Sequence, residues 1–262
     1  MRVAIEAILD YKFAEPTDVL LAVEAAALPD QRVVEQSHII DNAGPLTNKV
    51  GGSGIGRRTW TRSGTGRMVS SYRATVDVER PSVDIASLAR SPLPSLPEDV
   101  LPFIWPSRYC EADRFVSFVC GHFADLDGGA LVQALVDWVH ANLVYAPGSS
   151  NITTTAADTF VAQQGVCRDY AHLTAALIRS RDIPARLVSV YALDLDPPDF
   201  HAVVEVWLDG AWHLVDATRL APLETMVRIA VGRDATDIAF MTIFGGATMN
   251  AQSINVTRLP PP

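Results

Sequence analysis

Residues 165–218 join a helical pattern to a β-hairpin, and this order constrains the fold of the chain more than any other feature. After Cys167, apolar residues recur at the spacing of a mostly buried helix, which Pro184 ends. Farther along, Asp209-Gly210 is a two-residue hairpin turn signal between two runs rich in β-branched and aromatic residues. Helices followed by such strands predict an α+β core in which helices pack on an antiparallel sheet.

Cys167 stands in the first turn of the predicted helix. The free backbone N–H groups and the positive end of the helix dipole favour an anion there. A thiolate is the reactive form of cysteine, and the same N–H groups could hold the oxyanion of a tetrahedral intermediate. The alternative is a small buried core thiol, which is the common fate of a free cysteine.

The hairpin brings a histidine and an aspartate together. With Leu208 opposite Ala211, the register places Val203 opposite Asp216. His201 shares the face of Val203, so His201 and Asp216 are diagonal neighbours. A carboxylate fixes the tautomer of an adjacent imidazole, and such an imidazole can deprotonate a nearby thiol. Taken singly, each residue also has a structural interpretation, His201 as a solvated residue at a strand start and Asp216 as a turn or cap residue.

Cys167, His201 and Asp216 together have the order and spacing of a Cys-His-Asp catalytic triad. The segments GVCRDYAHL, FHAVVEVWLDGAWHLVDAT and GRDATDIAFMTIFG resemble the bacterial transglutaminase-like superfamily, over about residues 100–250 and more weakly before them. The resemblance implies a papain-like α+β core in which Cys167 is the nucleophile, His201 the base and Asp216 the orienting acid. The superfamily includes transamidating enzymes, peptidases, amidases and members that have lost activity.

The chain is predicted to have an N-terminal β-domain at residues 1–80, a linker at 81–106 and a transglutaminase-like catalytic domain at 107–262. Short alternating segments separated by turn signals favour an antiparallel β-sandwich or a half-barrel in the first part. The resemblance also implies a small β-domain there. The linker is expected to be extended and packed along the body, because it contains six prolines: Pro81, Pro92, Pro94, Pro97, Pro102 and Pro106.

Charge and composition exclude some classes of partner. The net charge of −9 argues against nucleic acid and anionic membranes as partners, since both need clustered positive charge. No apolar stretch reaches transmembrane length, and the N-terminus lacks the features of a signal peptide. Three cysteines do not form a disulfide framework, so the expected location is the cytoplasm. Cys110 and Cys120 have no partners at metal spacing, which makes a zinc site unexpected.

Two loops invite other functions. Asp194, Asp196 and Asp199 form an acidic loop before His201, but it lacks the glycine and the terminal glutamate of a calcium loop. A solvated loop is expected, and if a cation binds, this is the first place to look. Lys49–Arg67 is rich in glycine and arginine without completing a phosphate-binding pattern. It is predicted to be a flexible hairpin that covers the cleft or contacts another subunit.

The expected function is thiol-dependent acyl transfer, in which a peptide or carboxamide bond is hydrolysed through an acyl-enzyme. The expected partner is a peptide or protein substrate, or a small amide. No cofactor is expected, because the nucleophile, the base and the oxyanion donors are all protein groups. Three alternatives stay open: transamidation with an amine acceptor, a catalytically idle module that binds peptides in the same cleft, and a triad that serves only core packing.

Overall fold

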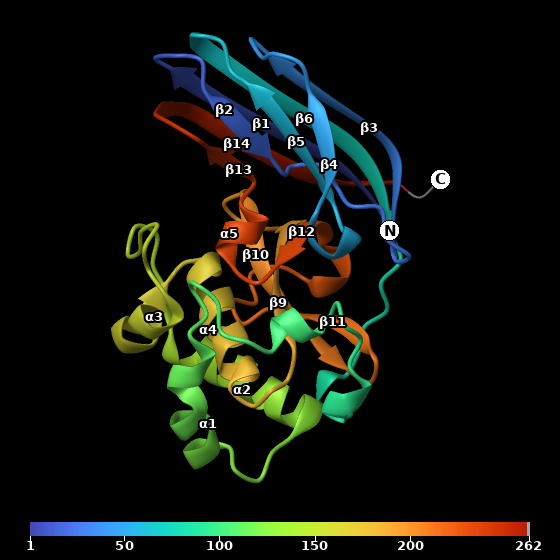
Figure 1. The fold of residues 1–262 in the computed structure, drawn as a ribbon. Helices are drawn as coiled ribbons and strands as arrows, with labels where there is room; N and C mark the ends of the chain where they lie inside the picture. The colour runs from blue at the N-terminus through green and yellow to red at the C-terminus, as the bar shows by residue number, and fades with distance from the viewer. Residues whose placement is uncertain (261–262) are drawn as a thin grey trace.

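The computed structural model describes residues 1–260 and shows a β-domain seated on an α+β core (Figure 1). The β-domain has two antiparallel four-stranded sheets. The first has the order β14 (Ala247–Leu259), β1 (Arg2–Phe13), β6 (Gly66–Val78), β3 (Gln31–Asp41); the second has the order β13 (Met241–Ile243), β2 (Asp18–Leu21), β5 (Arg57–Arg62), β4 (Thr47–Val50).

Alternation along β1 builds the interior of the β-domain. Val3, Ile5 and Ala7 are buried while the residues between them are half-buried, and they form one apolar cluster with Val19 and Leu21 of the other sheet. The predicted sandwich-like domain is therefore confirmed. The same cluster extends into the core below the two sheets, because Tyr191 and Val227 belong to it.

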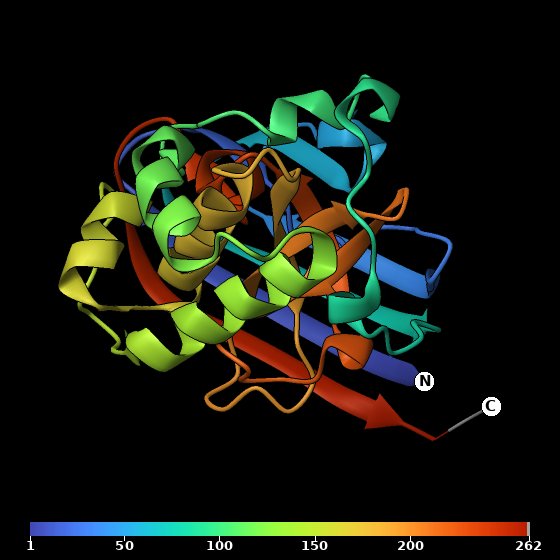
Figure 2. The ribbon, with the colours of Figure 1, turned by 90° about the horizontal axis from the view of Figure 1, so that it is seen from below.

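The C-terminal residues do not belong to the domain to which the sequence analysis assigned them. The predicted catalytic domain ran to residue 262, but β13 pairs with β2, and β14 pairs with β1 along its whole length, from Arg2 opposite Leu259 to Phe13 opposite Ala247. Residues 241–259 thus complete the β-domain, and the predicted boundary is wrong for them. No turn signal announces this pairing, because the partners lie at opposite ends of the chain. Figure 2 shows β14 running beside the N-terminal strand.

The core is built on a third antiparallel sheet, with the order β11 (Ala211–Val215), β10 (Phe200–Leu208), β9 (Ala185–Tyr191), β12 (Val227–Gly232). Helix α4 (Cys167–Arg179) packs on β9 and β10, and α2 (Gly128–Asn142) packs on α4. The remaining elements of this part are α1 (Val116–His122), β7 (Val144–Tyr145), α3 (Ala156–Ala162), β8 (Gln164–Gly165) and α5 (Ala235–Ile238). This arrangement confirms the predicted α+β class.

The linker follows the surface of the core as an irregular chain with three short 3-10 turns: η2 (Ile85–Ser87), η3 (Leu93–Ser95) and η4 (Leu101–Phe103). Of the other short 3-10 turns, η5 (Ala112–Phe115) lies before α1 and η6 (Leu223–Thr225) before β12. Leu88 accepts a hydrogen bond from Gly129 N–H at 2.9 Å, and Ala89 accepts one from Asp209 N–H at 2.9 Å. The linker is thereby held against both the start of α2 and the β10–β11 turn.

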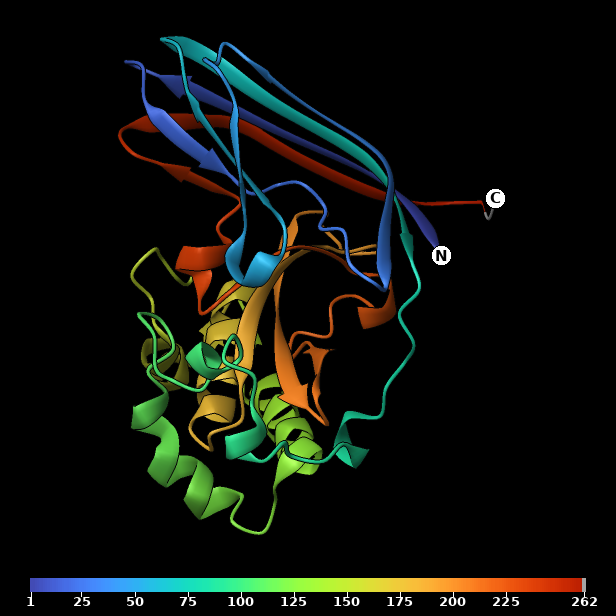
Figure 3. The same ribbon diagram turned by 45° about the vertical axis from the view of Figure 1, so that its right-hand side comes forward.

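The Gly- and Arg-rich segment is a hairpin of β4 and β5, and its connection contains the short turn η1 (Gly52–Gly54). Figure 3 shows this connection reaching from the β-domain down to the core. At Gly56, whose φ is +76°, a Cβ would lie 2.2 Å from the Ile229 carbonyl oxygen of β12. The hairpin therefore contacts β12 of its own chain, and only glycine permits the approach. Within residues 1–260, no helix combines the length and the apolar character needed to cross a bilayer.

Candidate active site

Cys167 is the first residue of α4, as the sequence predicts, and its side chain is half-buried. Two local features fix its position. The Asp169 carboxylate accepts the Val166 N–H at 2.8 Å, which caps the helix start. The short parallel pair β7–β8 places Tyr145 opposite Gly165, two residues before Cys167. The thiol therefore lies at a helix N-terminus that is fixed by the Asp169 cap and by the β7–β8 pair.

His201 and Asp216 meet as the hairpin register predicts. Leu208 lies opposite Ala211, and His201 Nε2 donates a hydrogen bond to Asp216 Oδ2 at 2.8 Å. The two side chains are only 1% and 4% exposed. A charge-assisted hydrogen bond between side chains that are this deeply buried is expected to be much stronger than an ion pair on the surface.

The structure also places the Cys167 side chain beside this pair. Burial alone would lower the pKa of His201, but hydrogen bonding to Asp216 and to Cys167, together with their charges, raises that pKa to about 10. The imidazole is consequently held as an imidazolium at neutral pH, next to a sulfur at a helix N-terminus. The three residues predicted from the sequence are thus brought together in one place.

Thr218 is a site residue that the sequence analysis missed. Its hydroxyl donates to Asp216 Oδ2 at 2.8 Å and its backbone N–H donates to Asp216 Oδ1 at 2.8 Å. The same hydroxyl lies 3.5 Å from His201 Nε2. The signal was present, because an aspartate that precedes a residue by two positions often accepts the N–H of that residue.

Tyr145 is the second residue that was missed. Burial, followed by the charge of Cys167 and hydrogen bonding with it, raises the pKa of Tyr145 to about 12. Its ring also packs near that of Tyr170 on α4, with 5.9 Å between the ring centroids. A phenol thus lies next to the thiol, on the element that pairs with the residues before it. No sequence pattern predicts this, because a two-residue strand is too short to show alternation.

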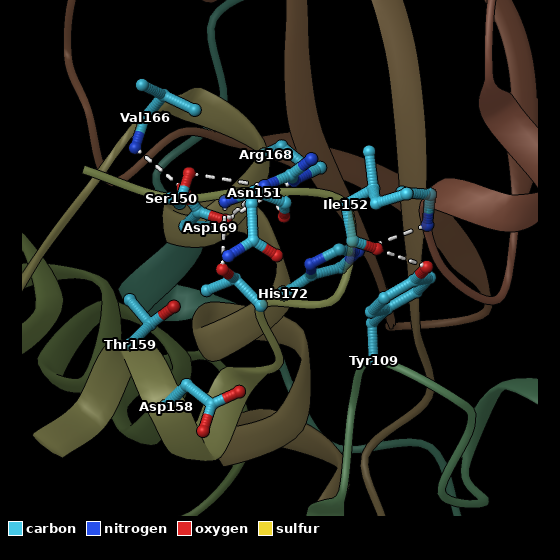
Figure 4. A network of polar contacts seen from close by, with 12 residues as sticks. Tyr109, Ser150, Asn151, Ile152, Asp158, Thr159, Val166, Arg168, Asp169 and His172 are labelled. Carbon is cyan, nitrogen blue, oxygen red and sulfur yellow. Dashed lines mark hydrogen bonds and ion pairs between the residues drawn. The ribbon is translucent and has the colours of Figure 1, made fainter. Parts of the chain in front are cut away.

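Arg168 and Asp169 hold the loop before α3 against the start of α4 (Figure 4). Arg168 Nη2 donates to the Asn151 carbonyl at 2.8 Å and to Ser150 Oγ at 3.2 Å, and it is paired with Asp169 at 3.0 Å. On the other side, Tyr109 donates its hydroxyl hydrogen to the Ile152 carbonyl at 2.7 Å. The pair is therefore fixed against the loop before α3 rather than standing free in solvent.

His172 has a structural role in the core. It is fully buried, its Nε2 accepts the Ala235 N–H at 3.1 Å, and the Tyr109 ring stacks on it at 5.1 Å. Burial lowers the pKa of His172 to about 4, so it is neutral. It joins α4 to α5. Arg233, in the turn before α5, pairs with Asp237 and not with its neighbour Asp234.

The acidic loop before His201 is used within the chain. Asp199 Oδ1 accepts hydrogen bonds from Phe200 N–H at 2.7 Å and from Gln252 Nε2 at 2.5 Å, so the loop docks on β14. Over residues 1–260, there is no group of three or more histidine, cysteine or acidic side chains placed to hold a metal ion.

Comparison with known proteins agrees with the fold. Residues 122–217 match the model of the transglutaminase-like superfamily. The full chain superposes on a structure from Cytophaga hutchinsonii, solved as a putative cysteine protease, with a TM-score of 0.94 and 35% identity; the match covers 100% of this chain and 92% of that one.

The curated relatives are less similar in sequence, and each match covers a smaller share of this chain. The uncharacterized protein ML0607 of Mycobacterium leprae is 32% identical over 142 residues, which is 49% of this chain and 50% of that protein. The uncharacterized protein Rv2569c of Mycobacterium tuberculosis is 28% identical over 82 residues, or 31% of this chain and 26% of that protein. The chain thus spans half or less of the curated relatives it matches. The fold, the family match and the full-length structural relative agree, and the chain belongs to the transglutaminase-like superfamily.

Proposed function

We propose that the chain is a thiol-dependent acyl-transfer enzyme that hydrolyses a peptide or carboxamide bond. The observation that carries this proposal is the buried His201–Asp216 hydrogen bond of 2.8 Å beside Cys167, which stands at a helix start. The name given to the Cytophaga hutchinsonii protein, a putative cysteine protease, supports hydrolysis as the outcome. The substrate class, a peptide, a protein or a small amide, is part of the proposal.

The geometry supports two half-reactions. In the first, the Cys167 thiolate attacks the carbonyl carbon, and the carbonyl electrons move to oxygen, where the free N–H groups of α4 stabilise the charge. The intermediate collapses, the C–N bond breaks, and the His201 imidazolium gives its proton to the leaving amine. An acyl-thioester on Cys167 remains.

In the second half-reaction, neutral His201 takes a proton from water, whose oxygen attacks the thioester carbon. The C–S bond then breaks, which releases a carboxylic acid and restores the thiolate beside the imidazolium. Asp216 keeps the imidazole oriented and stabilises its charged form throughout. Every proton and electron pair is carried by side chains of this chain, the substrate or water.

The first test is the reactivity of the thiol. Iodoacetamide is applied at pH 5 to 9, and the labelled cysteines are mapped by mass spectrometry. Cys167 should label at least 10-fold faster than exposed Cys120 at pH 6, where an ordinary thiol is protonated. His201→Ala should remove that advantage. Cys110 is buried and should react last, because burial raises the pKa of its thiol to about 11.

The second test is turnover. A library of peptides and amides is offered with and without an added amine, using the natural chain and Cys167→Ala. Product from the natural chain and none from the variant supports the assignment. Equal labelling of Cys167 and Cys120, or turnover by Cys167→Ala, would show that the nucleophile is wrongly assigned.

A further inference from the structure

A cavity of about 370 Å³ opens between the outermost strands of the two sheets of the β-domain. Strand β3 is the last strand of the first sheet, β4 is the last strand of the second, and residues of both line the cavity. Gly54 and Gly56 of the β4–β5 connection complete one wall. The Gly- and Arg-rich segment, which the proposed acyl transfer does not use, therefore borders a separate space to which the catalytic triad contributes no side chain.

Three long side chains that carry hydrogen-bond donors line this cavity, one from each of three strands. They are Gln36 of β3, Lys49 of β4 and Arg57 of β5. Gln36 and Lys49 are exposed, and the Arg57 side chain is 49% exposed. An occupant of the cavity can therefore reach all three side chains.

Hydrogen bonding inside the chain determines which end of the Gln36 amide is left for an occupant. The Tyr72 hydroxyl oxygen accepts the Ala25 N–H at 2.8 Å, and the hydroxyl donates its single hydrogen to Gln36 Oε1 at 3.0 Å. Burial raises the pKa of Tyr72 far above its ordinary value, so this hydrogen stays in place at neutral pH. Gln36 therefore offers its NH₂ group, a donor, to the cavity.

The charges in the lining leave a positive excess. Among residues 1–260, the lining holds one carboxylate, Glu24, against the two cations Lys49 and Arg57. The Glu24 side chain is only 7% exposed, and it already contacts Arg57 and His38 at 3.1 Å each and Thr59 at 3.3 Å. Burial alone would raise the pKa of Glu24, but hydrogen bonding to His38 and the charge of Arg57 lower it. Glu24 is thus an internal anion with its own partners, and one positive charge remains for an occupant.

We propose that this cavity binds the phosphate group of a small organic phosphate monoester through Gln36, Lys49 and Arg57. Each of the three offers N–H donors, and three donors that come from three strands suit the three oxygens of a phosphate monoester better than the two oxygens of a carboxylate. A cavity of this size is typical of a site for an organic ligand rather than for a bare ion. Val33 and Val50 supply apolar wall for the organic part.

Binding is tested by calorimetric titration of the full chain with glycerol phosphate, inorganic phosphate, acetate and glycerol, each at constant ionic strength set by sodium chloride. Glycerol phosphate should bind saturably and more tightly than inorganic phosphate or acetate, and glycerol should not bind. The melting temperature should rise with the concentration of glycerol phosphate, because the ligand joins Gln36 of the first sheet to Lys49 and Arg57 of the second. Cys167→Ala should bind as the natural chain does, since Cys167 does not line the cavity.

Substitutions assign the binding to the cavity. Gln36→Glu keeps an acceptor for the Tyr72 hydroxyl but replaces the donor by a negative oxygen, and should abolish binding. Lys49→Gln should weaken binding at least about 10-fold, the effect of losing a charge-assisted hydrogen bond. Lys12→Gln is the matched control, because it removes the charge of another exposed lysine of the β-domain that does not line the cavity, and it should leave binding unchanged.

A further variant tests the space itself. Ala27 is an exposed residue of the lining, so Ala27→Trp fills the cavity without changing any charge and should block binding. This result decides the matter if Gln36→Glu does not fold.

Three results would each contradict the proposal. The first is no saturable binding of glycerol phosphate. The second is binding of inorganic phosphate or acetate that is as tight as that of glycerol phosphate, which would show that the cavity does not select an organic phosphate. The third is binding that survives both Lys49→Gln and Ala27→Trp, which would place the ligand elsewhere on the chain.

Discussion

Thr218 holds both oxygens of the Asp216 carboxylate, and through it the position of His201. Thr218→Val keeps the shape and the backbone N–H but removes the hydroxyl, so Asp216 Oδ2 loses one of its two donors. The loss of about 1 kcal/mol for one hydrogen bond corresponds to a roughly 5-fold slower alkylation of Cys167 at pH 7. The pH at which His201 loses its proton should also fall, as measured from the alkylation–pH profile.

Thr218→Ser is the matched control, because it restores the hydroxyl and should restore both the rate and the profile. A Thr218→Val profile that coincides with that of the natural chain would show that the hydroxyl only supports packing.

His201 also links stability to pH. Its pKa is about 10 in the folded chain, above the ordinary value of 6.5. Folding therefore favours the imidazolium, so its contribution is complete below about pH 6.5 and is lost as the pH rises through about 10. Asp216→Asn removes the main partner, and the variant should lose more unfolding free energy at pH 6 than at pH 10. Urea unfolding at both pH values measures this, and an equal loss at both would contradict the raised pKa.

At the residue scale, the sequence correctly predicted those positions that are determined by neighbouring residues in the chain. Cys167 follows a helix start and His201 pairs with Asp216 through a two-residue turn, so both could be placed without knowing the fold. Tyr145 could not, because its position depends on a parallel pairing with Gly165 across α3. Nor could the burial of Arg168 and Asp169 against Asn151 be read from a charged pair in a first turn.

At the scale of elements, the start of α2 is pressed against the linker. A Cβ on Gly129 would lie 1.8 Å from the Ile85 carbonyl oxygen and 2.9 Å from that of Leu88. Gly129→Ala must therefore separate η2 from α2, at an expected cost of about 2–4 kcal/mol in unfolding free energy. Urea denaturation measures the loss.

Gly121→Ala in α1 is the control, because nothing lies within 4 Å of its added Cβ. It should be neutral or stabilising by up to about 1 kcal/mol, as alanine favours helix over glycine. Equal effects of the two substitutions would mean that the linker moves away from the added methyl group without a loss of unfolding free energy.

Sequence signals differ in strength between elements. The β10–β11 turn has positive φ at Asp209 (+52°) and Gly210 (+77°), which is the conformation that this residue pair favours. Its register was therefore predictable to the residue. The cap of α3 is Thr155, and its exact position was not predictable, because several consecutive polar residues before the helix can all serve as caps.

At the scale of the whole molecule, the N-terminal and C-terminal parts of the chain depend on each other for their folded structure. Residues 107–262 expressed alone would leave β13 and β14 without β2 and β1, and would expose Tyr191 and Val227, which belong to the shared apolar cluster. This fragment should fail to fold, as judged by poor dispersion in a ¹H–¹⁵N spectrum. Coexpression with residues 1–106 should restore dispersion, and a well-dispersed spectrum of the fragment alone would contradict this.

The sequence could not reveal this dependence. β14 alternates much as β1 does, but nothing in its residues specifies a partner, and the pairing of Arg2 with Leu259 spans nearly the entire chain. The core fold was predictable because its helix and hairpin are contiguous. The boundary was not, because strand pairing between chain ends leaves no local trace.

The pairing of β1 with β14 also determines when the first sheet can be completed during synthesis. Strand β1 leaves the ribosome well before β14 and waits for it, an interval on the order of tens of seconds at typical translation speeds. Throughout that interval one edge of β1 stays open to other nascent chains. Escape from aggregation therefore depends on how quickly translation finishes, and slow codons late in the message should harm this protein more than slow codons early in it.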